Sequence, residues 1–121
     1  MSKPSPKAPA ESVALYETLL ATIPEIDRKG ATMPYTSVNG NMFSICSPGG
    51  EVALRLPAEQ RQEFLERYST HLREAYGIVQ REYVVVPDDL LARIDELAPW
   101  FEASYRYAAG LRPKATTRAK R

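Results

Sequence analysis

The chain has 121 residues, 44% hydrophobic and 26% charged, with a formal net charge of +1, a composition typical of one soluble domain with a single core. No stretch approaches the roughly 18 consecutive apolar residues of a membrane span, and the opening residues MSKPSPKAPAES lack the apolar run of a secretory signal. We therefore expect a cytoplasmic protein without membrane contact. The single cysteine, Cys46, excludes an internal disulfide and a cysteine-based metal cluster.

The charges divide the chain into an acidic body and two basic ends. Residues 1–10 and 111–121 together hold seven Lys and Arg and no acidic residue, whereas residues 11–110 hold nine basic and fifteen acidic side chains, a net of −6. The ends are poor in large apolar residues, so we predict two disordered basic tails flanking one domain over residues 11–110. Such tails attract phosphate weakly, while the body repels it.

The first element is predicted to be an amphipathic helix over residues 11–23. Its apolar side chains recur at helical spacing, and Pro24 ends it. The repeat consists of Val13, Tyr16, Leu19, Leu20 and Ile23.

Three strands in a meander are predicted next, over residues 32–38, 41–47 and 52–56. Asn39-Gly40 is suited to a two-residue hairpin turn, and Pro48-Gly49-Gly50 forms the second turn. Pro34 places the first strand at an edge of the sheet or at a bulge. In the second strand, simple alternation predicts that Phe43 and Ile45 face away from Met42, Ser44 and Cys46.

The second half is predicted to be mainly helical. Pro57 opens a helix over residues 57–68, and residues 69–81 remain open between strand and loop. Residues 83–86 are β-branched and aromatic, which indicates a strand. Asp88 is the expected N-cap of the next helix.

The last region is divided into helices 88–94 and 96–109 by the interruption at residues 95–99, because Pro99 is expected only in a first turn. Gly110 takes the capping position. The order α-βββ-α-β-αα predicts an α+β fold: a mainly antiparallel sheet of about four to five strands with helices packed on one face.

Residues around the hairpin resemble the amino-terminal domain of the TfoX/Sxy competence regulators. The resemblance extends over residues 11–110, and the small YjbR-like and YdhG-like domains are similar to it. The residues that carry it are Met33, Tyr35, Asn39-Gly40, Met42-Phe43, Leu54-Arg55-Leu56, Phe64, Tyr83, Val86-Pro87, Leu90 and Trp100.

The resemblance implies the α+β fold and a regulatory or binding role without an assigned activity. Two departures are visible: Pro34-Tyr35-Thr36 replaces the family's Phe-Gly-Gly, and Arg55 replaces a lysine that is common at that point. We also expect no second, helical domain after residue 110, so the regulatory role of the full-length regulators is not implied.

No residue pattern predicts catalysis, a metal or a cofactor. His71 is the only histidine, and no neighbour in the sequence supplies the oriented nucleophile that a general base requires. Cys46 is expected to be a small buried residue. Gly49-Gly50 leads into a strand rather than a helix, which favours a turn over a phosphate loop.

The candidate binding residues are Lys29, Tyr35, Arg55, His71 and Tyr83. Arg28 and Lys29, with Arg55, form a basic strip on the sheet in one interpretation. In the other, Arg55 pairs with Glu51 or Glu82 across strands. Among the aromatic residues, Phe43, Phe64, Phe101 and Tyr105 are assigned to the core, while Tyr35, Tyr83 and Tyr107 stay open between core and groove.

Three functions remain. The leading hypothesis is a non-enzymatic domain that binds another protein or a second copy of itself through a sheet edge or face. The second is weak nucleic-acid association through the basic tails. The third is binding of a small molecule near His71, Tyr83 and Arg55.

Overall fold

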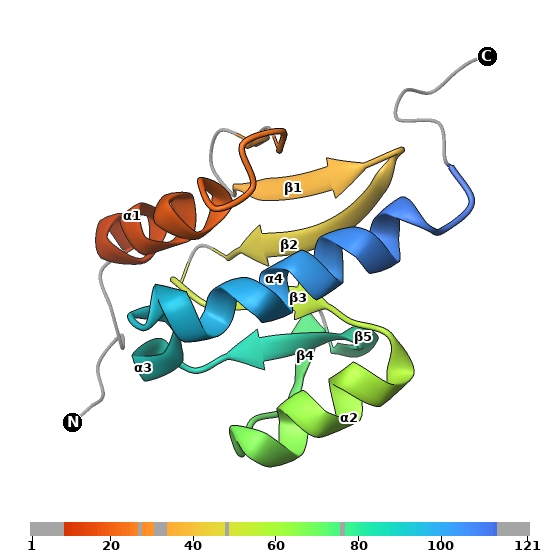
Figure 1. The fold of residues 1–121 in the computed structure, drawn as a ribbon. Helices are drawn as coiled ribbons and strands as arrows, with labels where there is room; N and C mark the ends of the chain where they lie inside the picture. Colours follow the sequence, from red (N-terminus) through yellow and green to blue (C-terminus); the bar gives the residue numbers. More distant parts are fainter. Residues whose placement is uncertain (1–8, 27, 31–33, 48, 76, 114–121) are drawn as a thin grey trace.

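A computed structural model describes residues 9–26, 28–30, 34–47, 49–75 and 77–113 (Figure 1). The elements are α1 (Pro9–Leu20), β1 (Tyr35–Val38), β2 (Asn41–Cys46), β3 (Val52–Arg55), α2 (Ala58–Arg67), β4 (Leu72–Ala75), β5 (Ile78–Val86), α3 (Asp88–Leu91) and α4 (Ile94–Ala109). The α+β class is confirmed. The five strands agree with the predicted four to five, and the order α-βββ-α-ββ-αα contains one strand more than the predicted order.

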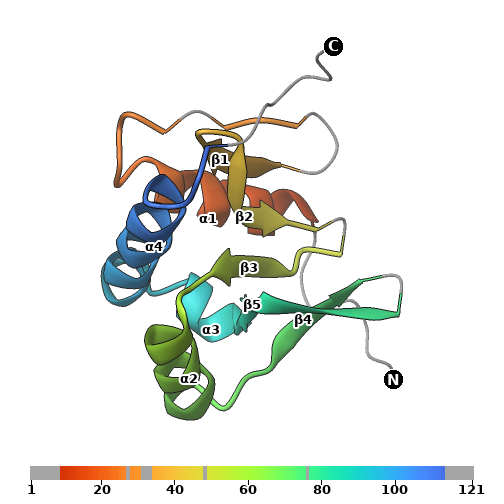
Figure 2. The ribbon, with the colours of Figure 1, turned by 90° about the vertical axis from the view of Figure 1, so that its right-hand side faces the viewer.

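The five strands form one antiparallel sheet in the order β1-β2-β3-β5-β4. The helices lie against one face of it, with α4 crossing the middle, α1 beside β1 and β2, and α2 beside β5 (Figure 2). Val52, Leu54 and Leu56 point into this helical layer, as their alternation predicts.

The β1–β2 hairpin turns at Asn39 and Gly40, whose φ angles of 54° and 80° are both positive. The sequence predicts such a turn, because Asn and Gly tolerate this conformation better than other residues. β1 is an edge strand, as Pro34 indicates, although its start is covered by a backbone bridge from Lys29 to Tyr35. Residues 31–33, including Met33, lie outside the described residues.

The predicted alternation in β2 is wrong at Phe43. The register with β1 shifts between Thr36 and Ser37, so that Thr36 pairs with Ser44 and Ser37 pairs with Met42. Phe43 is the extra residue of a bulge. As a result Phe43 joins Cys46 in the core, while Ser44 shares a buried hydrogen bond of 2.6 Å with Tyr16 of α1.

The helix ends differ from the predicted bounds for local reasons. α1 begins at Pro9 and ends at Leu20, after which the chain continues in tighter turns to Ile23. α3 is capped by Pro87, and Asp88 is its first residue rather than its N-cap. The predicted tail disorder falls mainly on residues 1–8 and 114–121, outside the described residues.

Pro99 lies inside α4, which corrects the prediction of a break at residues 95–99. The helix starts at Ile94, so Pro99 belongs to its second turn. A proline there removes one backbone hydrogen bond. Tertiary packing offsets that loss, because Leu97, Phe101 and Ala108 of the same helix are fully buried.

Residues 69–81, left open between strand and loop, contain β4 and the start of β5. The two strands form a hairpin, with Ala75 opposite Ile78 and Gly77 at a φ of 75°. β3 pairs only with residues 83–86 of β5, so the first half of the hairpin extends beyond the sheet (Figure 2).

The core lies between the sheet and the helices. Its largest fully buried side chains are Tyr16, Phe43, Phe64 and Phe101, and Cys46 is buried with them, as the sequence predicts for Cys46 and the three phenylalanines. Tyr105 is only half-buried, packed against this core. None of the helices in the described residues is long and apolar enough to cross a membrane.

Candidate interaction surface

The five sequence-predicted binding residues do not form one site. Lys29 and Tyr35 are joined by two backbone hydrogen bonds of 2.8 and 2.9 Å beside β1, and the Lys29 ammonium donates to Ser37. Arg55 and Tyr83 are register partners on β3 and β5. His71 is exposed and lies just before β4, at the opposite edge of the sheet from β1.

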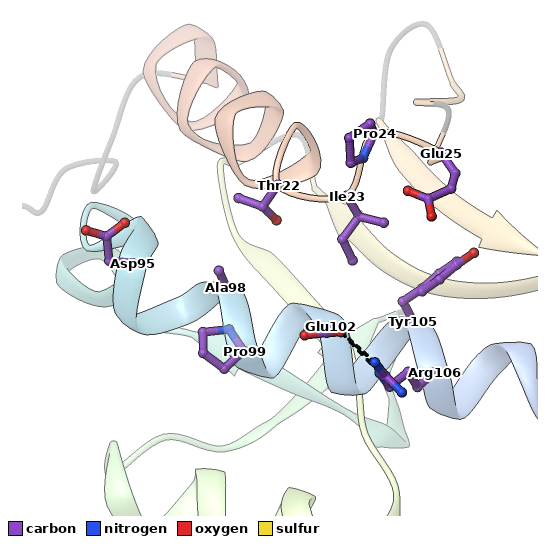
Figure 3. A pocket seen from close by; sticks show the side chains of 10 residues that line it. All are labelled: Thr22, Ile23, Pro24, Glu25, Asp95, Ala98, Pro99, Glu102, Tyr105 and Arg106. Carbon is purple, nitrogen blue, oxygen red and sulfur yellow. Dashed lines mark hydrogen bonds and ion pairs between the residues drawn. The ribbon is translucent and has the colours of Figure 1, made fainter.

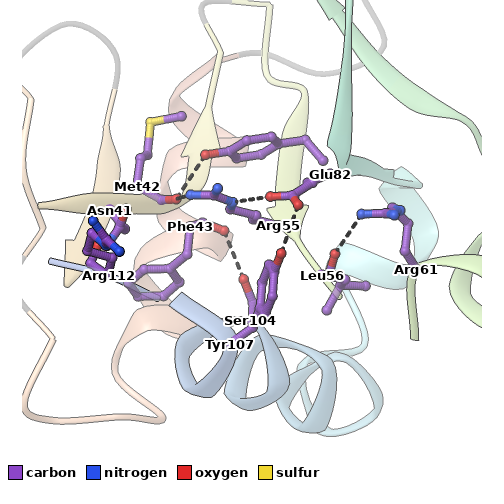
Figure 4. A network of polar contacts seen from close by, with 11 residues as sticks. Asn41, Met42, Phe43, Arg55, Leu56, Arg61, Glu82, Ser104, Tyr107 and Arg112 are labelled. Carbon is purple, nitrogen blue, oxygen red and sulfur yellow. Dashed lines mark hydrogen bonds and ion pairs between the residues drawn. The ribbon is translucent and has the colours of Figure 1, made fainter. Parts of the chain in front are cut away.

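Arg55 is the last residue of β3, and its side chain lies between β2, β5 and α4 (Figure 4). Its Nε donates to Glu82 at 2.7 Å and its Nη1 donates to the Met42 carbonyl at 3.3 Å. The hydroxyl of Tyr107, on α4, donates to the other oxygen of Glu82 at 2.7 Å. The guanidinium therefore joins β2, β5 and α4, and the pairing of Arg55 with Glu82 is the alternative that the sequence left open.

The charged and polar groups of this network are paired with one another within the chain. Burial raises the pKa of Glu82, but the hydrogen bonds from Tyr107 and Arg55 outweigh it and leave the pKa below its usual value. Burial raises the pKa of Tyr83, whose hydroxyl donates to the Met42 carbonyl at 2.9 Å. Glu82 thus stays ionised and fully paired, which suits it to holding strands together rather than to accepting a proton.

A groove of about 640 Å³ lies between the end of α1 and the outer side of α4 (Figure 3). We call it the α1–α4 groove. Its lining residues are Thr22, Ile23, Pro24, Glu25, Asp95, Ala98, Pro99, Glu102, Tyr105 and Arg106. Five of them are apolar or aromatic, and they line both the α1 side and the α4 side of the groove: Ile23, Pro24, Ala98, Pro99 and Tyr105.

The rim of the α1–α4 groove is acidic. Asp95 lies at one end of it and Glu25 lies at the other, near Tyr105 (Figure 3). Neither carboxylate forms an ion pair within the described residues. Glu102 is paired with Arg106 at 2.8 Å on the same helix. Among the described residues, the groove therefore presents two carboxylates without ion-pair partners to an occupant.

A second concavity of about 400 Å³ lies on the other side of α4, against α2. It shares Pro99, Glu102 and Arg106 with the α1–α4 groove, so these three residues form a ridge between two hollows. Pro99 contributes directly to this shape, because it projects a ring and offers no backbone N–H at that point.

The tip of the β4–β5 hairpin is the other unusual surface. Ile78 and Val79 are 66% and 51% exposed, and they are the large hydrophobic residues most open to solvent in the described part of the chain. Because consecutive residues of a strand point to opposite faces, each face of the hairpin tip carries one exposed apolar side chain.

Sequence reasoning missed the α1–α4 groove. The sequence pattern places Ile23 on the apolar face of the first helix, Pro24 at its end and Pro99 at an interruption. A usable signal was present: Ala98, Glu102, Tyr105 and Arg106 recur at three- and four-residue spacing, and their stripe is less apolar than the buried stripe of the same helix. What could not be read from the sequence is that α1 ends beside this stripe.

The described residues contain no group of three or more His, Cys, Asp and Glu side chains placed to hold a metal ion.

A set of hydrogen bonds links α2 to α4. The Tyr68 hydroxyl donates to Glu96 at 2.7 Å and accepts from the Trp100 indole at 3.2 Å. These contacts fix α2 against α4.

Comparison with known families assigns most of this fold. The family model described as the TfoX N-terminal domain matches residues 36–108, which is 73 of the 121 residues. The match begins at the second residue of β1 and ends in the last turn of α4, so it includes nearly all of the sheet and the α4 side of the groove. Searches of curated proteins and of solved structures found no match.

Proposed function

This chain belongs to the TfoX N-terminal domain family, and from that premise we propose that it is a non-enzymatic domain that binds a basic segment of another protein in the α1–α4 groove. The resemblance that the sequence indicates is thereby confirmed at the level of the family. The observation that carries the proposal is a groove with apolar lining on its α1 and α4 sides and acidic residues at both ends.

Several features support binding rather than chemistry. The most connected polar cluster, around Arg55 and Glu82, has its charges paired internally. His71, the only histidine, is exposed on a different part of the molecule from that cluster. Glu25 and Asp95, in contrast, are exposed carboxylates beside an apolar lining, an arrangement that favours recognition of a charged apolar peptide over proton transfer.

The groove defines the chemistry of its partner. Ile23, Pro24 and Tyr105 offer apolar contact to Pro or aliphatic side chains, while Glu25 and Asp95 attract Lys or Arg at either end. A segment with two basic residues flanking an apolar centre satisfies both requirements. Exposed ion pairs contribute little affinity each, so we expect weak binding that depends on salt.

The test is a selection of random twelve-residue peptides displayed on phage against the intact chain. Enriched peptides should carry Lys or Arg on both sides of apolar residues or proline. Binding of the synthesised peptides should be lost in a groove variant, Glu25→Lys with Asp95→Lys. The matched control is Glu59→Lys with Glu63→Lys, because Glu59 also lies in the first turn of a helix and both side chains are exposed on α2.

The control variant changes the net charge by the same amount, so it separates groove binding from general electrostatic attraction. Peptides that bind the two variants equally well, or a selection that enriches no basic apolar peptide, would overturn the proposal.

A second candidate, self-association, is favoured by a separate observation at the β4–β5 hairpin. Ile78 and Val79 are exposed at its tip, and β4 is an edge strand at the border of the sheet. If this surface joins two copies, the mass measured by light scattering should rise with concentration. It should remain that of a monomer in an Ile78→Ser, Val79→Ser variant.

A further inference from the structure

We propose that residues 114–121 of the same chain occupy the α1–α4 groove and compete there with the partner segment. The inference rests on the proposed function of the groove and adds its regulation. The segment is strongly basic, because residues 114–121 contain Lys114, Arg118, Lys120 and Arg121 and no acidic residue. The groove holds Glu25 and Asp95 without ion-pair partners in the described part of the chain.

The described chain ends beyond the Glu25 end of the groove. α4 ends at Ala109, and the Arg112 carbonyl accepts a hydrogen bond of 3.0 Å from the Asn41 side chain at the β1–β2 turn. This contact fixes Arg112 on the side of α4 that faces β1 and β2. The Glu25 end of the groove, which adjoins Tyr105 and Arg106, lies toward that same end of α4 (Figure 3).

The lengths also agree. Along α4, the groove extends from Arg106 back to Asp95, eleven residues or about 16 Å at 1.5 Å each. The eight residues 114–121 reach about 26–29 Å when extended. Asp95 lies fourteen residues, or about 21 Å, before the end of α4 at Ala109. Running antiparallel to α4, the segment therefore reaches Glu25 readily and reaches the Asp95 end only when it is nearly extended.

Competition follows from the tether. A segment joined to the domain by a few residues has an effective concentration on the order of millimolar. Contacts with a dissociation constant below that value therefore keep the groove mostly occupied. A partner then binds with an apparent affinity reduced by the fraction of molecules whose groove is free. Neutralising the segment should therefore strengthen peptide binding.

The test places a nitroxide spin label on the intact chain through Ala119→Cys. Cys46 is buried and reacts far more slowly than an exposed cysteine. The label should remove most of the amide signal intensity of Ile23, Ala98 and Glu102 at low salt. That loss should disappear near 1 M salt, where the Debye length falls to about 3 Å.

Two variants decide the result. Groove signals should recover in the groove variant, Glu25→Lys with Asp95→Lys, and stay broadened in the α2 control, Glu59→Lys with Glu63→Lys. A second variant leaves the folded domain untouched: Lys114→Gln, Arg118→Gln, Lys120→Gln and Arg121→Gln should bind the selected peptides several-fold more tightly than the parent chain.

Broadening spread evenly over the surface, or centred elsewhere, would overturn the inference, as would equal peptide affinity with and without the four positive charges. Peptides that bind the groove in a chain whose label shows no groove contact would leave the proposed function standing and refute the competition alone. Loss of peptide binding to the groove altogether would refute the proposed function first.

Discussion

Replacing Arg55 by methionine tests whether this residue holds the fold together or waits for a ligand. The change keeps much of the aliphatic stem and removes the guanidinium that joins Glu82 to the Met42 carbonyl. A hydrogen bond between charged groups contributes about 1.5–3 kcal/mol when buried. Because the Arg55 and Glu82 side chains are 20% and 36% exposed, we discount this pair to roughly 1 kcal/mol.

The bond to the Met42 carbonyl adds about 0.5–1 kcal/mol, so the expected loss in the free energy of unfolding is about 2 kcal/mol. For a domain of this size, the melting temperature should then fall by roughly 10 °C. Calorimetry or urea unfolding measures both quantities. Arg67→Met is the control: its pair with Glu63 is 4.0 Å long and more than half exposed, and its loss should cost less than about 1 kcal/mol.

An Arg55→Met variant as stable as the parent would refute this reasoning. Residues kept for ligand binding often cost stability, so their removal is neutral or stabilising. That outcome would return Arg55 to the list of binding residues that the sequence suggested.

Three further predictions concern other parts of the molecule. Glu82→Gln should lower the free energy of unfolding by its full amount near neutral pH, and by less as the pH falls below about 4.3, the ordinary Glu pKa. The reason is that the pKa of Glu82 is lowered in the folded chain, so protonation removes the stability that the carboxylate contributes. A pH-independent difference in urea unfolding would contradict this prediction. Phe43→Ala should cost about 3–5 kcal/mol, because the bulge turns this ring into the core; a loss below about 1 kcal/mol would mean that Phe43 faces solvent. Ile78→Ser with Val79→Ser should leave the unfolding free energy within about 0.5 kcal/mol of the parent, since both side chains are exposed; a clear loss would show that the tip packs within its own chain.

The elements that local chemistry determines were predictable from the sequence. Asn39-Gly40 suits a turn with positive φ at both positions, and the structure has that turn. Val52, Leu54 and Leu56 alternate, and all three are in the core. Where neighbouring residues decide the conformation, the sequence is sufficient.

The errors arise where tertiary packing decides. Phe43 and Ser44 both face the helical layer because β2 contains a bulge whose position depends on pairing with β1. Pro99 is kept inside α4 because Phe101 and Leu97 bury the helix against the sheet. In both cases a long-range contact overrides the preference of the local sequence.

The candidate site was harder to predict from the sequence than the fold. The sequence offers Glu82 as one of two partners for Arg55, and the structure contains that pair. The sequence does not indicate that Tyr107 of α4 completes the network by donating to the same carboxylate. The α1–α4 groove joins residues about 70 positions apart in sequence, such as Pro24 and Asp95, and no local pattern indicates that they share a surface.

The most direct test of the central claim is a nuclear magnetic resonance titration of the intact chain with a selected basic apolar peptide. Binding in the α1–α4 groove predicts saturable shifts of the amides of Ile23, Ala98 and Glu102, which weaken as salt is added. Shifts confined to the β4–β5 hairpin or to the residues around Arg55, with the groove amides unchanged, would contradict it.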